Sequence, residues 1–218
     1  MTVSFPLSLS EFWDQLPIAA LTMDCAPQLE SSGTAAGQQL VRELAPALWR
    51  GTVTLGKLTP DEAADAAGLI DLVRQPGASF LACDLTRPYP AYDPDGSVLD
   101  GATVLIQSIG ASRRDLSLSG LPPYYQLRRG DLVGVSWGAS PVRYGMHRVA
   151  VPSNADANGF TGMIEVAPAL PAGVVMASPA VLARPFFKAM VTPNSVRPGA
   201  RRSGLVEGAS FDFIQTVR

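Results

Sequence analysis

The residues best suited to covalent chemistry are Ser136 and His147, the single histidine of the chain. Ser136 is central in Gly134-Val135-Ser136-Trp137-Gly138, which matches the G-x-S-x-G nucleophile elbow of α/β-hydrolases. An elbow needs a strand, a sharp turn and a helix, and then an acid followed by a histidine. Here Ala139-Ser140-Pro141 interrupts any helix, and no acidic residue lies between Ser136 and His147. The motif therefore favours a strand that ends in a glycine turn, and we expect no enzyme.

The remaining reactive side chains favour neither a metal site nor a cofactor site. Cys25 and Cys83 are the only cysteines, and with one histidine they cannot complete the four ligands of a usual zinc site without carboxylates. We expect both thiols to be reduced, buried and structural, with an isolated disulfide as the alternative. No glycine-rich phosphate loop separates a strand from a helix. Arg129-Gly130-Asp131 is typical of a hairpin turn.

Composition indicates a folded chain without attraction to nucleic acid or membrane. The 218 residues carry 17 Lys and Arg against 19 Asp and Glu, a formal net charge of −2, and 47% of them are hydrophobic. No apolar run reaches membrane-spanning length. The first nine residues hold no basic side chain, so we expect no secretory signal.

The elements that must position these residues are mainly β-strands, organised around one helix. Thr59-Pro60-Asp61-Glu62 combines a hydroxyl N-cap, a proline at the first helical position and a carboxylate three residues after the cap, which predicts a helix over 60–74. Alternating apolar residues predict strands over 49–55 and 79–85 on either side of it. Further strands are expected at 18–23 and 40–44, with a loop or extended hairpin tip over 29–37.

The second half of the chain predicts a small all-β domain. Proline, glycine and aspartate cluster over 88–96, which indicates a boundary at about 92–101. Six short strands separated by turn residues follow: 103–109, 115–118, 132–137, 144–151, 163–166 and 174–182. So many short strands suit a closed barrel, because closure removes free sheet edges. Two more strands, 186–191 and one through Phe211, Phe213 and Gln215, complete the chain. We therefore predict a first domain over 1–92 and 184–218, and an inserted barrel over 101–183.

Several segments of this arrangement resemble the distal tail proteins of long-tailed, non-contractile bacteriophages and related prophages. They are Phe5-Pro6-Leu7, the strand from Leu48 to Leu55 with the helix after it, the helix-to-strand return from Arg74 to Asp84, the barrel segments from Arg128 to Asp131 and from Tyr144 to Val149, and the closing run from Ser210 to Thr216.

The resemblance implies a mainly β fold with a minor α component: a tail-tube-like β-sandwich with one flanking helix, carrying an inserted small β-barrel. The barrel is expected to be of the oligosaccharide-binding type, with another small β-fold as the alternative. It also implies a structural virion protein, assembled in the host cytoplasm, whose six copies form a ring at the tail tip. The implied partners are further copies of the chain, the tail tube protein and the tail-tip hub or baseplate protein.

For such a ring we expect subunit contacts from the first domain, through the hairpin side chains Leu40, Arg42 and Leu44, and through Leu72, which falls off the apolar stripe of the helix. The alternative function is a carbohydrate-binding module that contacts a host surface glycan. Its stacking platform would consist of the aromatic side chains Tyr124, Tyr125, Trp137 and Tyr144.

Overall fold

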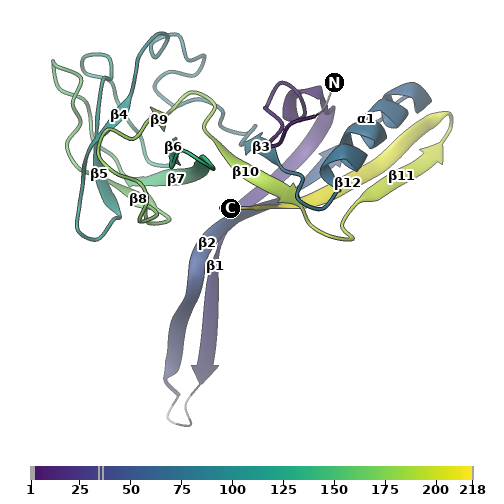
Figure 1. The fold of residues 1–218 in the computed structure, drawn as a ribbon, viewed down its shortest axis with the longest axis horizontal. Coiled ribbons are helices and arrows are strands. Elements are labelled where there is room, and N and C mark those ends of the chain that lie inside the picture. The colour runs from purple at the N-terminus through teal and green to yellow at the C-terminus, as the bar shows by residue number, and fades with distance from the viewer. Residues whose placement is uncertain (1–2, 34, 36, 218) are drawn as a thin grey trace.

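The structure, a computed structural model, describes residues 3–33, 35 and 37–217, and these residues form a mainly β protein with two antiparallel six-stranded sheets (Figure 1). Within them lie one 3₁₀ helix, one α-helix and twelve strands. In chain order they are η1 (Trp13–Gln15), β1 (Ile18–Gly33), β2 (Gln39–Leu55), α1 (Pro60–Val73), β3 (Phe80–Cys83), β4 (Leu105–Ile109), β5 (Asp115–Ser119), β6 (Leu132–Trp137), β7 (Arg143–Val151), β8 (Ile164–Ala167), β9 (Ala180–Val181), β10 (Phe186–Val191), β11 (Arg197–Arg202) and β12 (Leu205–Gln215).

The first sheet has the strand order β1-β2-β12-β10-β3, with β11 paired to β12. Helix α1 and the N-terminal segment pack on one of its faces. Trp13 of η1 stacks on Phe80 at 5.8 Å between ring centroids and meets Phe213 edge-on at 5.4 Å. These rings belong to one buried cluster with the inward side of α1. These aromatic pairs therefore hold η1, near the start of the chain, against strands β3 and β12 of the first sheet.

The predicted helix is confirmed, because its sequence contains its own start signal. The backbone N–H of Thr59 donates to Glu62 Oε2 at 2.8 Å, and the N–H of Glu62 donates to Thr59 Oγ1 at 3.4 Å, which completes a capping box. Ala66, Ile70 and Val73 form its buried side. The helix ends at Val73, one residue before the predicted end.

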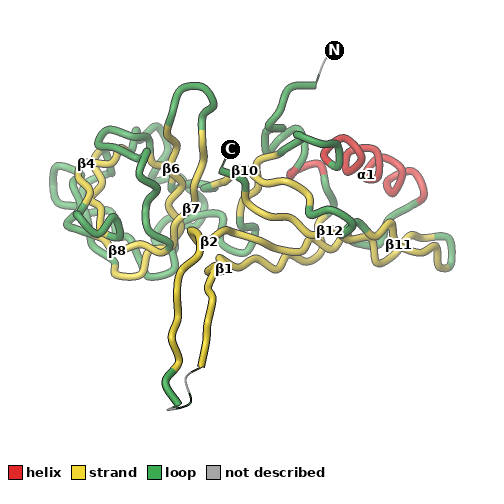
Figure 2. Tube along the Cα trace, turned by 60° about the horizontal axis from the view of Figure 1, so that its bottom comes forward, coloured by secondary structure: helices red, strands yellow, loops and turns green. Residues whose placement is uncertain are grey.

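The hairpin before the helix is longer and more regular than the sequence predicts. Strands β1 and β2 are continuous ribbons of 16 and 17 residues, so the predicted separation into shorter strands is wrong. Their register shifts around Pro27 and Pro46, and a proline is tolerated there because a bulge does not need its N–H. Beyond this bulge the two strands leave the sheet as an arm (Figure 2). Residues 29–33 belong to β1, whereas residues 34 and 36 of the predicted tip lie outside the described residues.

The second sheet closes into a barrel. Its strand order is β4-β5-β8-β7-β6-β9, and residues 177–180 also bond to β4. The N–H of Ile106 donates to the Ser178 carbonyl, and the N–H of Ala180 donates to the Val104 carbonyl, both at 3.0 Å. The barrel thus has six strands rather than the five of the oligosaccharide-binding type, so the structure agrees with the alternative of another small β-fold. Strand β9 is shorter than predicted, because a turn from Val175 to Ser178 precedes it.

The chain leaves the first sheet after β3 and returns to it at β10, and residues 105–181 form the barrel between them. The two parts are packed together. The indole Nε1–H of Trp49 donates to the Met146 carbonyl at 2.6 Å, and Tyr144 packs against Phe186 at 5.4 Å. Met146 itself belongs to the core of the first sheet. Strand β7 is therefore shared between the two cores, which fixes the barrel beside the base of the arm.

Candidate functional site

The arm carries a group of exposed apolar side chains. We define it as residues 27–33 of β1 and 39–46 of β2, which stand clear of both sheets in Figures 1 and 2. Leu29, Leu40, Val41 and Leu44 are 51%, 52%, 58% and 61% exposed. Clustered apolar side chains of this size are typical of an interaction surface.

These side chains lie on both faces of the arm. Leu40 and Leu44 each lie two residues from Arg42 on β2, so these three side chains share one face of the strand. Val41 is adjacent to Leu40 and lies on the opposite face. Leu29 pairs in register with Glu43, which places it on the face of Val41. Each face therefore carries two large apolar residues. Covering only one side of the arm would leave half of its apolar surface in water.

The arm also has two different free edges. Strand β1 is the edge of the first sheet, and β2 pairs with β12 only from Arg50 to Thr54. Among the described residues, no strand lies beside the outer edge of β2 from Gln39 to Leu48. Free edges of this length offer a row of unpaired N–H and C=O groups to another chain.

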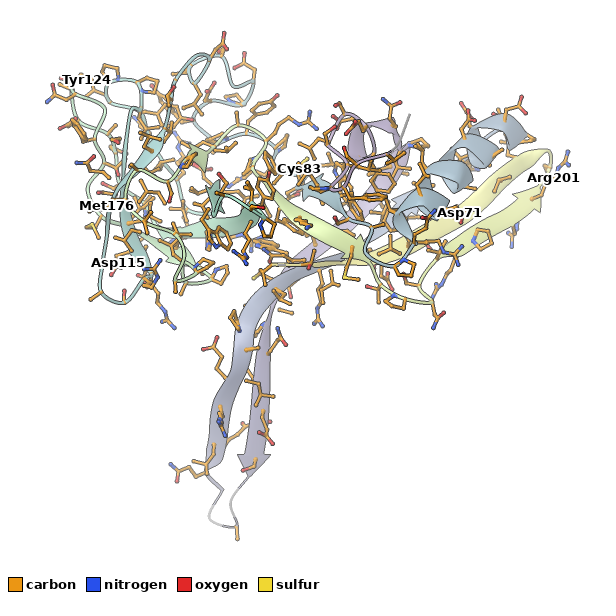
Figure 3. The ribbon with its side chains drawn as sticks, in the orientation of Figure 1. Asp71, Cys83, Asp115, Tyr124, Met176 and Arg201 are labelled. Carbon is orange, nitrogen blue, oxygen red and sulfur yellow. The ribbon has the colours of Figure 1, made fainter. Side chains whose placement is uncertain are left out.

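The predicted contact residues do not form one surface. Leu40, Arg42 and Leu44 are exposed together on one face of the arm. Leu72 is half-buried on α1, next to the exposed Asp71, which lies well apart from the arm in Figure 3. The four residues can therefore serve two distinct contacts.

The aromatic platform predicted for a glycan is not assembled, and this prediction is wrong. Tyr125 is fully buried in the barrel and meets Tyr92 edge-on at 5.3 Å, and Trp137 is 9% exposed on the inward face of β6. Tyr144 lies against Phe186 between the two sheets. Only Tyr124 is strongly exposed, at 67%, and it lies on the far side of the barrel from the arm (Figure 3). Tyr125 and Trp137 are part of the barrel core, which buries large apolar side chains.

The two residues of the hydrolase motif point away from each other. In the antiparallel pair β6–β7, Ser136 is opposite Tyr144 and His147 is opposite Val133. Ser136 and Val133 are three residues apart on β6, so the side chains of Ser136 and His147 lie on opposite faces of the sheet. As the sequence predicts, the motif is a strand that ends in a turn, with Gly138 at φ 78°.

His147 is buried and neutral. Its Nδ1–H donates to the Pro168 carbonyl at 2.8 Å, and its Nε2 has no hydrogen-bond partner. Because the carbonyl can only accept, this bond fixes the tautomer with a lone pair on Nε2. Burial lowers the pKa of His147 to about 4, which keeps the ring uncharged at neutral pH.

Both cysteines are free; Cys83 is buried as predicted, whereas Cys25 is only half-buried. Burial raises the pKa of Cys25 to about 11 and also raises the pKa of Cys83, so neither thiol is activated. Arg129-Gly130-Asp131 forms a turn in which Asp131 is fully buried. Among the described residues, no group of three or more His, Cys, Asp or Glu side chains is placed to hold a metal ion. Nor does any described helix have the length and apolarity needed to cross a membrane.

Sequence reasoning missed the extent of the arm. The signal was present: prolines lie near facing positions of both strands, at Pro27 and Pro46, and large apolar residues beyond them occur at both odd and even positions of β2. That pattern is typical of a ribbon without a buried face.

No known family model matches the chain, and no curated protein sequence matches it. The fold and the arm define a mainly β protein with a protruding two-stranded ribbon, and its function is argued from this geometry.

Proposed function

We propose that the chain is a structural subunit that assembles head-to-tail with copies of itself into a closed ring. The observation that carries the proposal is the arm, which exposes apolar side chains on both faces and leaves two different strand edges unpaired. Such a surface favours association with another surface, because association covers the apolar side chains and pairs the free strand edges.

The difference between the two edges supports a head-to-tail contact. The outer edge of β1 and the outer edge of β2 are distinct surfaces, so a contact that joins one to the other repeats in the same direction from copy to copy. Repeated heterologous contacts close into a ring when the rotation per copy divides a full turn. The resemblance to distal tail proteins supports a ring of six copies at the tail tip of a virion, between the tail tube and the hub or baseplate.

The test is the assembly state of the purified chain and of virions. Native mass spectrometry is expected to show hexamers, and electron microscopy of the same sample is expected to show six-fold rings. A chain that stays monomeric at every concentration, with no ring at the tail tip of virions that contain it, overturns the proposal.

A host-glycan role has no comparable support. Of the four aromatic residues that would form its platform, Tyr124 alone is strongly exposed. A glycan array is expected to show no binding that depends on this side chain.

A further inference from the structure

A groove lies between the base of the arm and the barrel, with a volume of about 580 Å³. Its two walls are similar in composition: Ala45-Pro46-Ala47-Leu48 of β2 on one side, and Pro168-Ala169-Leu170-Pro171-Ala172 of the barrel on the other. Glu43 and Arg143 lie at its polar positions. A groove of this size that is mostly apolar, with a few polar groups, has the character of a binding site.

One wall of the groove is the outer edge of β2, beside which no described strand lies, and its Pro46 carbonyl accepts from the Gln28 side-chain amide at 2.9 Å. Strand β12 runs beside β2 as far as the pair Ile214 and Arg50, and then the side chain of Gln215 accepts the N–H of Trp49 at 3.1 Å. The chain beyond it is held by Arg143, whose Nε–H donates to the Val217 carbonyl at 3.0 Å. An extended segment that entered the groove would therefore lie beside residues 45–48 of β2, in line with β12.

The floor of the groove presents a hydrogen-bond acceptor that nothing in the protein satisfies. His147, which is 2% exposed, lines the groove together with Gly145 and Trp137. A Cβ on Gly145 would lie 3.1 Å from His147 Nε2 and 3.2 Å from the Trp137 ring, closer than ordinary packing contacts, so only glycine fits between the groove and the imidazole. A buried acceptor without a donor is unfavourable, and a donor brought by a bound segment relieves this.

We propose that this groove receives the arm of a neighbouring copy of the chain. The inference rests on the proposed ring and names the surface on which its contact is made. A single copy cannot fill its own groove with its own arm, because the base of the arm forms one wall. From Leu48 to Gln39, β2 runs for nine residue-to-residue steps, about 30 Å in an extended strand, and its outer part stands away from the barrel (Figure 1).

The arm and the groove are complementary in three respects. The arm supplies the exposed leucines that the proline-, alanine- and leucine-lined walls cover. Its exposed pair Glu30 and Arg42 carries the same two charges as Glu43 and Arg143 at the groove, so each acid can meet a base. Its β1 edge brings unpaired N–H groups and the hydroxyls of Ser31 and Ser32, and one of these donors would reach His147 Nε2.

The test uses one variant with a blocked groove and one with an altered arm. Ala169→Arg places a long charged side chain at an exposed position of the groove wall, and Ala157→Arg makes the same change at an exposed turn of the barrel outside the groove. Leu40→Asp with Leu44→Asp replaces the two large apolar residues on one of the two faces of the arm. We expect Ala169→Arg and the arm variant each to need at least tenfold higher concentration to assemble, and Ala157→Arg to assemble like the unaltered chain.

The decisive step is to mix the two assembly-deficient variants. The Ala169→Arg chain keeps its arm and the arm variant keeps its groove, so the mixture is expected to form a dimer with one copy of each, detected by native mass spectrometry.

If Ala169→Arg assembles normally while the arm variant does not, the arm binds elsewhere and the groove assignment is overturned, although the ring stands. If the mixture stays monomeric, the groove assignment is also overturned. If both variants assemble normally, the proposed ring contact itself fails.

A second readout follows the imidazole. Because His147 is the only histidine, its ring nitrogen signals need no assignment, and the Nε2 signal is expected to shift when the mixed dimer forms. An unchanged signal in a dimer that does form contradicts the contact at the groove floor.

Discussion

At the scale of single residues, His147 makes stability depend on pH. Its pKa is about 4 in the folded chain, below the ordinary value of 6.5, so the unfolded chain binds the proton first as the pH falls. The free energy of unfolding is therefore highest above pH 6.5, and it falls progressively by about 3 kcal/mol as the pH is lowered to 4. Chemical denaturation at several pH values is expected to show this slope. His147→Asn, whose amide can still donate to the Pro168 carbonyl, is expected to have a flatter profile between pH 4 and 6.5; an identical slope contradicts the assignment.

Two glycines at contrasting positions give opposite expectations for the same change. A Cβ on Gly51 would overlap the Thr22 carbonyl oxygen and lie 2.7 Å from the Phe213 ring, so Gly51→Ala is expected to lower the free energy of unfolding by about 1–3 kcal/mol. Gly68 lies in α1 with no neighbouring atom within 4 Å of such a Cβ, so Gly68→Ala is expected to raise it by about 0.5–1 kcal/mol. Thermal unfolding of both variants checks the pair. A stabilised Gly51→Ala chain would contradict the close packing of β2 on β1.

At the scale of elements, the start of α1 depends on its capping box. Thr59→Ala removes the hydroxyl that accepts the Glu62 N–H, and the expected loss is about 1 kcal/mol of unfolding free energy. Thr59→Ser keeps the hydroxyl and is expected to keep most of the stability. Equal losses in the two variants would show that the methyl group, and not the cap, matters.

The same element shows why some of the fold is predictable from sequence. A capped helix is specified by neighbouring residues, and the turns of the barrel are specified by local glycine and asparagine, so α1 and five of the six barrel strands lie close to their predicted positions. The length of β1 and β2 depends on their pairing with each other across Pro27 and Pro46, which no local pattern states. The short β9 likewise depends on a turn that the apolar run from 174 to 182 conceals.

The candidate site was predictable only in part, because exposure is a property of the whole molecule. Leu40, Arg42 and Leu44 were found from their alternation, and they are exposed. The groove could not be predicted from the sequence, because it joins three segments that are distant in the chain: 45–48, 143–147 and 168–172. These segments meet only because β7 is shared between the two cores. Tyr125 and Trp137 failed as platform residues for the same reason: aromatic composition does not state which side of a closed barrel a ring faces.

At the scale of the whole molecule, α1 offers an assembly surface in addition to the arm and the groove. Leu72 is half-buried and lies outside the core cluster, whereas Leu69, three residues earlier on the same helix, packs against that cluster. Leu72→Asp is therefore expected to impair ring formation more than folding, with a melting temperature close to that of the unaltered chain. Leu69→Asp is expected to lower the melting temperature, because it brings a carboxylate to the core boundary.

Native mass spectrometry and thermal unfolding, measured on both variants, separate the two effects. A Leu72→Asp chain that loses as much stability as Leu69→Asp would place Leu72 within the fold and leave the arm and its groove as the only assembly surfaces proposed for this chain.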